Sequence, residues 1–322
     1  MTDQAYHDQP RQDDPPDPAA QPPLFEVTAR GSYAPRIGAV GALGPGSPLP
    51  VARYWYRRFL EQSQHPRNTV ESYLYDLSFL ERTVGPKPID EVTSRDVAHY
   101  LGESHNPSTR KRRLTSVSGL FKWLIHTVKL IEHDPTESFY PDHIPLKTPR
   151  PLFEAEQQAM LDAAVADSPR SGLIVWLMLR LGLSRGEVLQ LRRDYIDFGD
   201  RDEPLVYVFY DNPRWRGKER KLAASPELEP LFLAFESEFR PGDVLFEMLP
   251  QSVNKMTERV ARAAGISKRV TPQTLRDTYA VERARDGADD GHLLALLGLA
   301  DDPRNRMSVR RYIKLAAPPV NN

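Results

Sequence analysis

The stretch LRLGLSRGEVLQL, residues 179–191, is the part of this chain from which its fold is most readily worked out. Ser184 is followed three residues later by Glu187, a spacing typical of a capping box at a helix start. The pattern predicts a helix over about 185–193, preceded by an apolar helix over about 171–182. The capping role alone is enough to account for Ser184 and Glu187.

Beyond this stretch the pattern changes from helix to strand. The β-branched and aromatic run LVYVFY at 205–210 predicts a strand, and Leu222-Ala223 is expected to pair back on it as a hairpin. The turn between them is strongly basic and contains Arg214, Arg216, Lys218, Arg220 and Lys221 around Trp215 and Gly217. Further helices are expected at about 153–166, 226–239 and 252–264, from Thr271 to Gly287, from Asp290 to Gly298, and from Ser308 through Tyr312.

Residues 51–134 predict a separate helical bundle. Apolar side chains from Val70 to Val84 recur at steps of three and four, which is one face of a helix. Thr93 with Asp96 predicts a capping box for a short second helix, and a third helix is expected from Ser108 to Val128. The start of that third helix carries four consecutive cations, Arg110, Lys111, Arg112 and Arg113.

Two proline-rich segments flank this bundle. Residues 1–50 hold ten of the thirty prolines and lack apolar periodicity, so they predict a disordered tail. Residues 135–151 hold five prolines and predict an extended linker to a second domain at 152–316, with 317–322 as a short tail. The expected fold class is mainly α with a small β-hairpin, an α+β chain of two domains.

Composition excludes several kinds of chemistry. Without any cysteine the chain has no disulfide, no thiolate metal site and no cysteine nucleophile. The 43 Lys and Arg residues balance the 44 Asp and Glu residues, so evidence for nucleic-acid binding has to come from local clusters. No run approaches the roughly 18 apolar residues of a membrane span, and the N-terminus lacks a signal-peptide pattern. We therefore expect a cytoplasmic protein with no membrane partner.

Sites for nucleotides and metals find little support. Gly217-Lys218 lacks the remaining residues of a phosphate-binding loop. The pairs Asp289-Asp290 and Asp301-Asp302 offer carboxylates for Mg²⁺, but acidic residues beside helix starts are more often caps. The expectation is a protein with no metal and no cofactor.

Three motifs in order resemble the signatures of the tyrosine recombinases, the phage integrase family. LRLGLSRGEVLQL resembles the first, TPQTLRDTYA at 271–280 the second, and LLALLGL at 293–299 followed by Tyr312 the third. The bundle at 51–134 resembles the core-binding domain of that family. The resemblance implies that the chain clamps duplex DNA, as a multimer on paired sites, and breaks and rejoins it through a covalent phosphotyrosine.

The resemblance also implies roles for individual residues. Tyr312 falls on the nucleophile, Arg276 on a phosphate-binding arginine, and Lys218 on the hairpin lysine that protonates the leaving 5′ oxygen, with Lys221 as its rival. Because a phenol ordinarily has a pKa of about 10, it needs an activating environment, and guanidinium groups can neutralise the charge that builds up on phosphate.

Several family positions carry other residues in this chain. The first-signature arginine falls at Ser184, and Arg185, one residue later, is the candidate substitute. The second-signature histidine is replaced by Gln273, which can donate a hydrogen bond but cannot carry a proton. The third-signature His or Trp is Leu299, and the insertion 300–307 is longer than the family usually carries.

The two basic clusters are candidate DNA contacts, with solvated surface as the alternative. A helix start is already positive, so the cations at 110–113 favour an external anion such as DNA. A hairpin tip with Arg214, Arg216 and Arg220 suits phosphate contacts. The expected partners are double-stranded DNA, further copies of the chain and, as an open alternative, a partner recombinase.

Two other hypotheses stay open at this point. The chain could be a DNA-binding protein of the same fold with a degenerate catalytic set, acting by occupancy, bridging or partnership with an active recombinase. It could also be a helical interaction protein, which would show no salt-dependent affinity for DNA. The target site, the number of protomers, the need for accessory proteins, and the choice among integration, excision and chromosome resolution are open as well.

Overall fold

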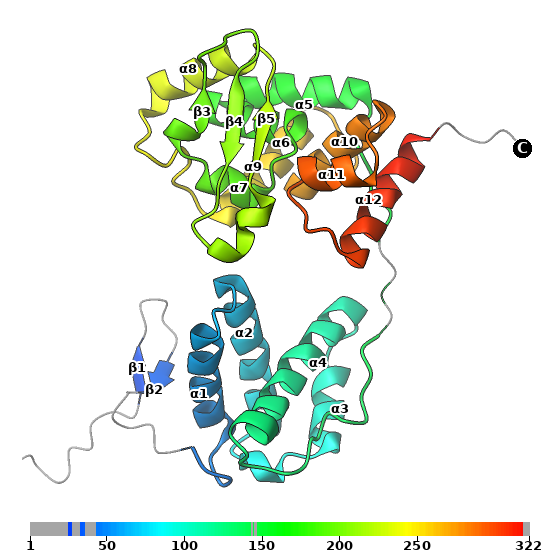
Figure 1. The fold of residues 1–322 in the computed structure, drawn as a ribbon. Coiled ribbons are helices and arrows are strands. Elements are labelled where there is room, and N and C mark those ends of the chain that lie inside the picture. The colour runs from blue at the N-terminus through cyan, green and yellow to red at the C-terminus, as the bar shows by residue number, and fades with distance from the viewer. Residues whose placement is uncertain (1–24, 28–32, 36–42, 143, 145–146, 318–322) are drawn as a thin grey trace, which may run out of the picture. The chain divides into compact units, whose positions relative to one another are not determined.

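The computed structural model describes residues 25–27, 33–35, 43–142, 144 and 147–317 (Figure 1). The chain divides into two compact units, residues 1–145 and 146–322, and the division falls inside the proline-rich segment 135–151. In the part that the structure describes, no helix combines the length and the apolar character needed to cross a bilayer.

The first unit is a helical bundle. It contains α1 (Leu49–Gln62), α2 (Arg67–Val84), α3 (Ser94–Gly102) and α4 (Pro107–Lys122), which continues into the π-helical turn Trp123–Thr127. Their apolar faces enclose one core that includes Tyr56, Leu77, Leu80, Tyr100 and Phe121. The capping box of Thr93 and Asp96 is present at the start of α3, as its spacing predicts.

The segment expected to be a disordered tail contains regular structure. Strands β1 (Phe25–Val27) and β2 (Tyr33–Pro35) pair antiparallel, and α1 begins at Leu49. The expectation is wrong for these residues, because a short strand pair forms backbone hydrogen bonds without the apolar periodicity whose absence suggested disorder. The same expectation for residues 1–24, 28–32 and 36–42, and the expected tail 318–322, lie outside the described residues.

The second unit surrounds an apolar helix. It contains α5 (Glu154–Asp167), α6 (Pro169–Arg180), α7 (Arg185–Gln190), β3 (Ile196–Asp197), β4 (Leu205–Val208), β5 (Arg220–Ala223), α8 (Leu228–Phe239), α9 (Pro250–Ala263), α10 (Pro272–Arg285), α11 (Asp290–Leu296) and α12 (Pro303–Ala316). Every residue of α6 from Ser171 to Leu179 is buried, and α5, α8 and α10 pack on this helix. The antiparallel sheet has the order β3-β4-β5, with Tyr207 opposite Lys221.

Helix α1 was not among the helices expected from the sequence, and two elements of the second unit also differ from the expectations. The two-residue strand β3 is too short to leave a sequence pattern. Helix α12 begins at Pro303 rather than at Ser308, because Asp302 accepts a hydrogen bond from the amide of Asn305 and Pro303 occupies the first turn. Ser308 therefore lies inside the helix.

Helices α10, α11 and α12 share a second, smaller apolar core. It includes Tyr279, Leu293, Leu297, Val309 and Tyr312. This core holds α12 against α10, and so it determines where the side chain of Tyr312 lies.

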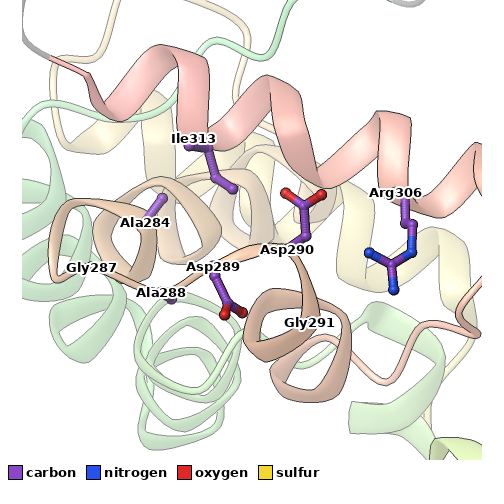
Figure 2. A pocket seen from close by; sticks show the side chains of 8 residues that line it. All are labelled: Ala284, Gly287, Ala288, Asp289, Asp290, Gly291, Arg306 and Ile313. Atoms are coloured by element: carbon purple, nitrogen blue, oxygen red, sulfur yellow. The ribbon is translucent and has the colours of Figure 1, made fainter.

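The aspartates near this core serve as caps and ion-pair partners. A pocket of about 650 Å³ lies beside them. Figure 2 shows Asp289, Asp290 and Arg306 among the residues that line it. Asp289 caps α11 by accepting a hydrogen bond from the amide of His292 at 2.8 Å, while Asp290 lies 2.7 Å from Arg310. The capping role expected for such aspartates is thus confirmed for Asp289.

Candidate active site

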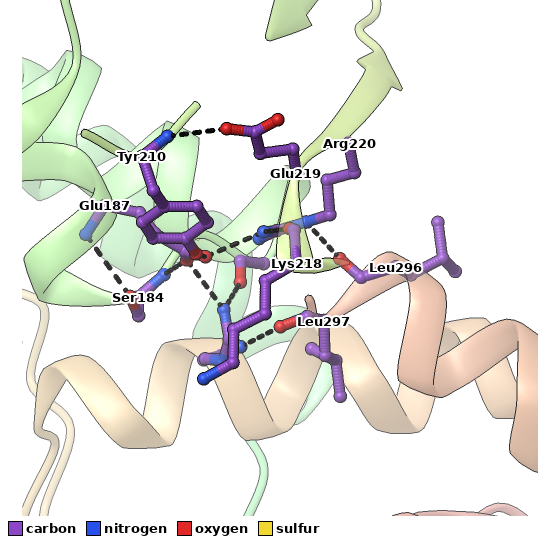
Figure 3. A network of polar contacts seen from close by, with 10 residues as sticks. Ser184, Glu187, Tyr210, Lys218, Glu219, Arg220, Leu296 and Leu297 are labelled. Carbon is purple, nitrogen blue, oxygen red and sulfur yellow. Dashed lines mark hydrogen bonds and ion pairs between the residues drawn. The ribbon is translucent and has the colours of Figure 1, made fainter. Parts of the chain in front are cut away.

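Two arginines from distant segments meet on one carboxylate. Glu187 Oε1 accepts hydrogen bonds from Arg220 Nη1 at 2.7 Å and from Tyr210 Oη at 2.5 Å (Figure 3). Its Oε2 lies 3.1 Å from Arg276 Nη1 and accepts a hydrogen bond from the amide of Ser184 at 2.6 Å. The capping box predicted from the sequence therefore places Glu187 where it joins α7, β5 and α10.

The charges of this network are well defined. Burial alone would raise the pKa of Glu187, but the hydrogen bond from Arg220 and the charges of Arg276 and Arg220 outweigh it and lower that pKa to about 2. Burial and the neighbouring Glu187 carboxylate raise the pKa of Tyr210 to about 12. At neutral pH the network thus contains an ionised carboxylate and a neutral phenol.

Arg276 is held from several sides. Its side chain donates hydrogen bonds to the carbonyls of Gly182 and Leu297 in addition to its contact with Glu187. Arg220 Nε likewise donates to the carbonyl of Leu296 at 2.8 Å. Because carbonyls at a helix C-terminus lack helical partners and carry partial negative charge, the end of α11 suits two guanidinium groups.

A cavity of about 410 Å³ lies beside this network. It is lined by Ser184, Arg185, Gly186, Asn254, Thr271, Pro272, Gln273 and Arg276. Arg185 Nη1 donates a hydrogen bond to Asn254 Oδ1 of α9 at 2.8 Å, which fixes the side chain at the cavity. Of the site residues expected from the sequence, the cavity thus brings together Arg185, Gln273 and Arg276.

Tyr312 lies apart from the residues that line this cavity. Its side chain is buried, and its Oη donates a hydrogen bond to Asp277 Oδ1 at 2.7 Å. Burial and the Asp277 carboxylate raise the pKa of Tyr312, and the charges of Arg311 and Arg276 only partly oppose this. The chain thus brings the phenol beside the residue that follows Arg276, but in this conformation its hydrogen-bond partner is a carboxylate.

The basic hairpin residues have different environments. Lys218 is half-buried with its Nζ 5.7 Å from the ring centroid of Trp215, and Arg216 and Lys221 are exposed. Arg220 is buried, with 7% of its side chain exposed. In this conformation its Nη1 and Nε donate to Glu187 and to the Leu296 carbonyl, and its expected role as a direct DNA contact stays a prediction. The side chain of Arg214 lies outside the described part of the structure.

The cations at the start of α4 do not form a single exposed cluster. Arg113 is buried, and its Nη1 donates a hydrogen bond to the Tyr100 carbonyl at 2.9 Å, so its expected role at the surface is wrong. Ion pairs at 2.9 Å and 2.8 Å join Arg112 to Asp76 and Arg110 to Asp142.

Lys111 is exposed, while the side chains of Arg110 and Arg112 are each about 40% exposed. A DNA contact through these three residues stays a prediction.

Sequence reasoning missed three residues of the site. It gave Glu187 a capping role only, because its other partners, Arg220 and Tyr210 on Oε1 and Arg276 on Oε2, come from distant parts of the chain. It passed over Asn254, for which no sequence signal exists. Asp277 did leave a signal, since it lies one helical turn after Gln273 and one residue after Arg276.

Sequence comparison gives matches along most of the chain. Residues 53–127 match the family described as the phage integrase N-terminal SAM-like domain. A tyrosine recombinase XerD from Ralstonia nicotianae is 26% identical over 280 residues, covering 80% of this chain and 88% of that protein. A tyrosine recombinase XerC from Lactobacillus delbrueckii subsp. bulgaricus is also 26% identical, covering 75% of this chain and 87% of that protein.

Solved structures show the same fold. A lambda integrase dimer bound to a COC' core site aligns with a TM-score of 0.65 at 15% identity, covering 92% of this chain and 96% of that one. The integrase of the transposon Tn1549, in complex with a circular intermediate DNA, aligns with a TM-score of 0.62 at 18% identity, covering 81% and 94%. The expected mainly helical fold with a small antiparallel sheet is thereby confirmed.

Proposed function

Because the chain is a member of the tyrosine recombinase family, we propose that it cuts and rejoins duplex DNA at specific sites through a covalent phosphotyrosine intermediate. The observation that carries this proposal is the cavity beside α10, in which Arg185, Gln273 and Arg276 lie together. Tyr312 lies on the helix packed against α10, one residue from Arg276 through its bond to Asp277.

Arg276 and Arg185 are the proposed phosphate-binding groups. An arginine has five N–H donors, and the three hydrogen bonds of Arg276 use both Nη1–H groups and one Nη2–H group. Within the described part of the chain, its Nε–H and second Nη2–H have no other partner. Two such donors can bind the non-bridging oxygens of a phosphodiester and stabilise the charge of the transition state.

Tyr312 and Lys218 are the proposed reacting groups. The phenol oxygen of Tyr312 forms a bond to phosphorus while the bond from phosphorus to the 5′ oxygen breaks, and Lys218 gives its proton to that oxygen. The phosphotyrosine keeps the energy of the broken bond, so rejoining needs no ATP. For the attack, the Tyr312 oxygen has to reach a phosphate bound in the cavity, whose lining does not include Tyr312.

Double-stranded DNA and further copies of the chain are the proposed partners. The lambda integrase relatives have been solved as a dimer on a core site and as a tetramer on a Holliday junction. Assembly on DNA can be measured by mass photometry with and without a bound duplex. A partner recombinase is a finer alternative, which predicts that the purified chain assembles on only one half of its site.

The decisive experiment looks for a covalent complex with DNA. Fragments bound by the protein are recovered from genomic DNA of its source, prepared as nicked duplexes, and tested for an adduct that survives denaturation. We expect an adduct that Tyr312→Phe abolishes and that Tyr75→Phe, a change at an exposed tyrosine of the first unit, leaves intact. Binding without any adduct would instead indicate a DNA-binding protein that has lost the chemistry.

A further inference from the structure

We propose that Asp277 is the catalytic base that accepts the phenol proton of Tyr312 when this residue attacks DNA. The inference rests on the proposed function and adds to it a proton acceptor. In the proposed step, the Tyr312 oxygen bonds to phosphorus as its proton passes to the Asp277 carboxylate. The bond from phosphorus to the 5′ oxygen breaks, and that oxygen takes a proton from Lys218, so protons and charges balance.

The contact required for this transfer is present in the structure. Tyr312 Oη donates its hydrogen bond to Asp277 Oδ1 at 2.7 Å, which is within the reach expected of a general base. Gln273 Nε2 donates to the same oxygen at 2.8 Å from one turn earlier on α10. The carboxylate is thus held from one side by an amide and presented to the phenol on the other.

The chain needs such an acceptor because Gln273 cannot take a proton. Gln273 lines the cavity with Arg276, and its amide can only donate or accept hydrogen bonds there. Asp277 lies four positions later on the same helix face and is half-buried. It is therefore the nearest ionisable acceptor that the described structure places on the phenol.

The surrounding charges favour transfer during the attack over prior ionisation of the phenol. The groups that act on Tyr312 are Asp277 and Arg276 of α10 and Arg311 of its own helix. Arg311 donates hydrogen bonds to the Lys147 carbonyl and to the Ser308 hydroxyl. Arg310, on the same helix, is paired with Asp290 of α11.

Burial and Asp277 together raise the pKa of Tyr312, so free phenolate is scarce at neutral pH. A carboxylate that accepts the attacking hydroxyl proton has a parallel in phosphoryl transfer by kinases.

The test compares rates of adduct formation across pH on the nicked duplexes recovered with the wild-type protein. Asp277→Asn keeps the shape and the hydrogen-bond acceptor but removes the proton acceptor, and Asp277→Glu restores a carboxylate. Asp286→Asn makes the same chemical change at the far end of α10 and is the matched control. Thermal unfolding of each variant verifies that the fold is retained.

We expect Asp277→Asn to slow adduct formation by roughly 10²–10⁴-fold, and Asp277→Glu to recover part of the rate. The wild-type rate is expected to depend little on pH from 6 to 9, because the phenol proton passes to Asp277 during the attack and the phenol need not ionise beforehand. The rate of Asp277→Asn is expected to rise about tenfold per pH unit, because this variant depends on the ionised phenol.

A second substrate separates Asp277 from Lys218. In a duplex with a 5′-bridging sulfur at the cleaved position, the leaving thiolate needs no proton, so Lys218→Ala is expected to regain activity while Asp277→Asn stays slow.

Equal or faster adduct formation by Asp277→Asn would overturn the inference and reduce the contact to one that holds the phenol in place. A slow variant whose pH profile parallels that of the wild type would overturn it as well, because a structural defect has that signature. If the wild-type protein forms no adduct, the proposed function fails and this inference falls with it.

Discussion

The carboxylate of Glu187 lies 3.1 Å from the guanidinium of Arg276, although 89 positions separate the two residues in the chain. The same carboxylate holds Arg220 of the hairpin at 2.7 Å. Glu187 thus determines how the proposed phosphate-binding arginine sits relative to the hairpin that carries Lys218. All three charged side chains are almost fully buried, so the contacts matter for folding as well as for the site.

Replacing Glu187 with Gln is expected to destabilise the second unit strongly. The change keeps the size of the side chain but leaves Arg220 and Arg276 as buried charges without a countercharge. Loss of one member of a buried ion pair typically costs about 3–5 kcal/mol of unfolding free energy. Urea unfolding of Glu187→Gln measures this, with Glu238→Gln at an exposed position of α8 as the control. Equal midpoints for the two variants would contradict the role assigned to Glu187.

The depressed pKa of Glu187 also predicts how stability depends on pH. The folded value is about 2, and an unfolded glutamate titrates near 4.5, so the unfolded chain binds more protons between these values. The contribution is present above about pH 4.5 and is lost as the pH falls towards 2, with a total of about 3 kcal/mol. The unfolding free energies of the wild type and of Glu187→Gln should therefore converge as the pH falls from about 4.5 to about 2. Parallel curves down to pH 2 would show that another group controls the acid transition.

Gly298 is expected to tolerate no side chain. Its φ of +56° favours glycine, and a Cβ there would lie 2.3 Å from Arg220 Nη1. Gly287 also has a positive φ, of +93°, but a Cβ at that position would meet no atom within 4 Å.

Gly287→Ala should therefore cost about 1 kcal/mol through backbone strain alone. Gly298→Ala should cost roughly 1–3 kcal/mol more, because the clash displaces Arg220 from Glu187. Thermal unfolding compares the two, and similar losses would mean that Arg220 yields without cost.

Arg185 is expected to act in place of the first-signature arginine, whose position is occupied by Ser184. Arg185→Ala removes a guanidinium from the cavity and should slow adduct formation by roughly 10²–10³-fold, the usual cost of one charge-stabilising donor. Arg262→Ala, at an exposed position of α9, is the control. If Arg185→Ala reacts as fast as this control, the hydrogen bond to Asn254 holds a surface residue and nothing more.

The sequence predicted most of the helices, because their signals are local, although α1 was not among them. Apolar spacing placed α2, and capping boxes at Thr93, Ser184 and Thr271 placed the starts of α3, α7 and α10. The start of α12 was misplaced, because both Ser308 and Asp302 are suitable capping residues. Only the structure shows that Asp302 caps the helix.

The environment of each cation could not be predicted in the same way. A basic run shows that cations are present but not which of them fold inwards. Arg113 and Arg220 both belong to such runs, yet each is buried because an acceptor far along the chain lies opposite it: the Tyr100 carbonyl for Arg113 and Glu187 for Arg220. The contact of Tyr312 with Asp277 depends likewise on the packing of α12 on α10, which no local pattern encodes.

The hairpin provides the last prediction, which separates surface cations from buried ones. Lys218 has no countercharge in the described structure and Lys221 is exposed, so each can neutralise a DNA phosphate. Lys218→Ala and Lys221→Ala should each weaken DNA binding across sequences and reduce the salt dependence of log Kd by about one unit of slope.

Arg201→Ala, a change at a side chain that is 79% exposed, is the control and should leave the slope unchanged. Arg220→Ala is expected to behave differently from the lysine variants and from the control. It should mainly lower the unfolding temperature, with little change in the salt slope, because the charge of Arg220 faces Glu187. Fluorescence anisotropy from about 50 to 200 mM salt measures the slopes. A full unit of slope lost in a folded Arg220→Ala variant would mean that this guanidinium leaves Glu187 to contact DNA.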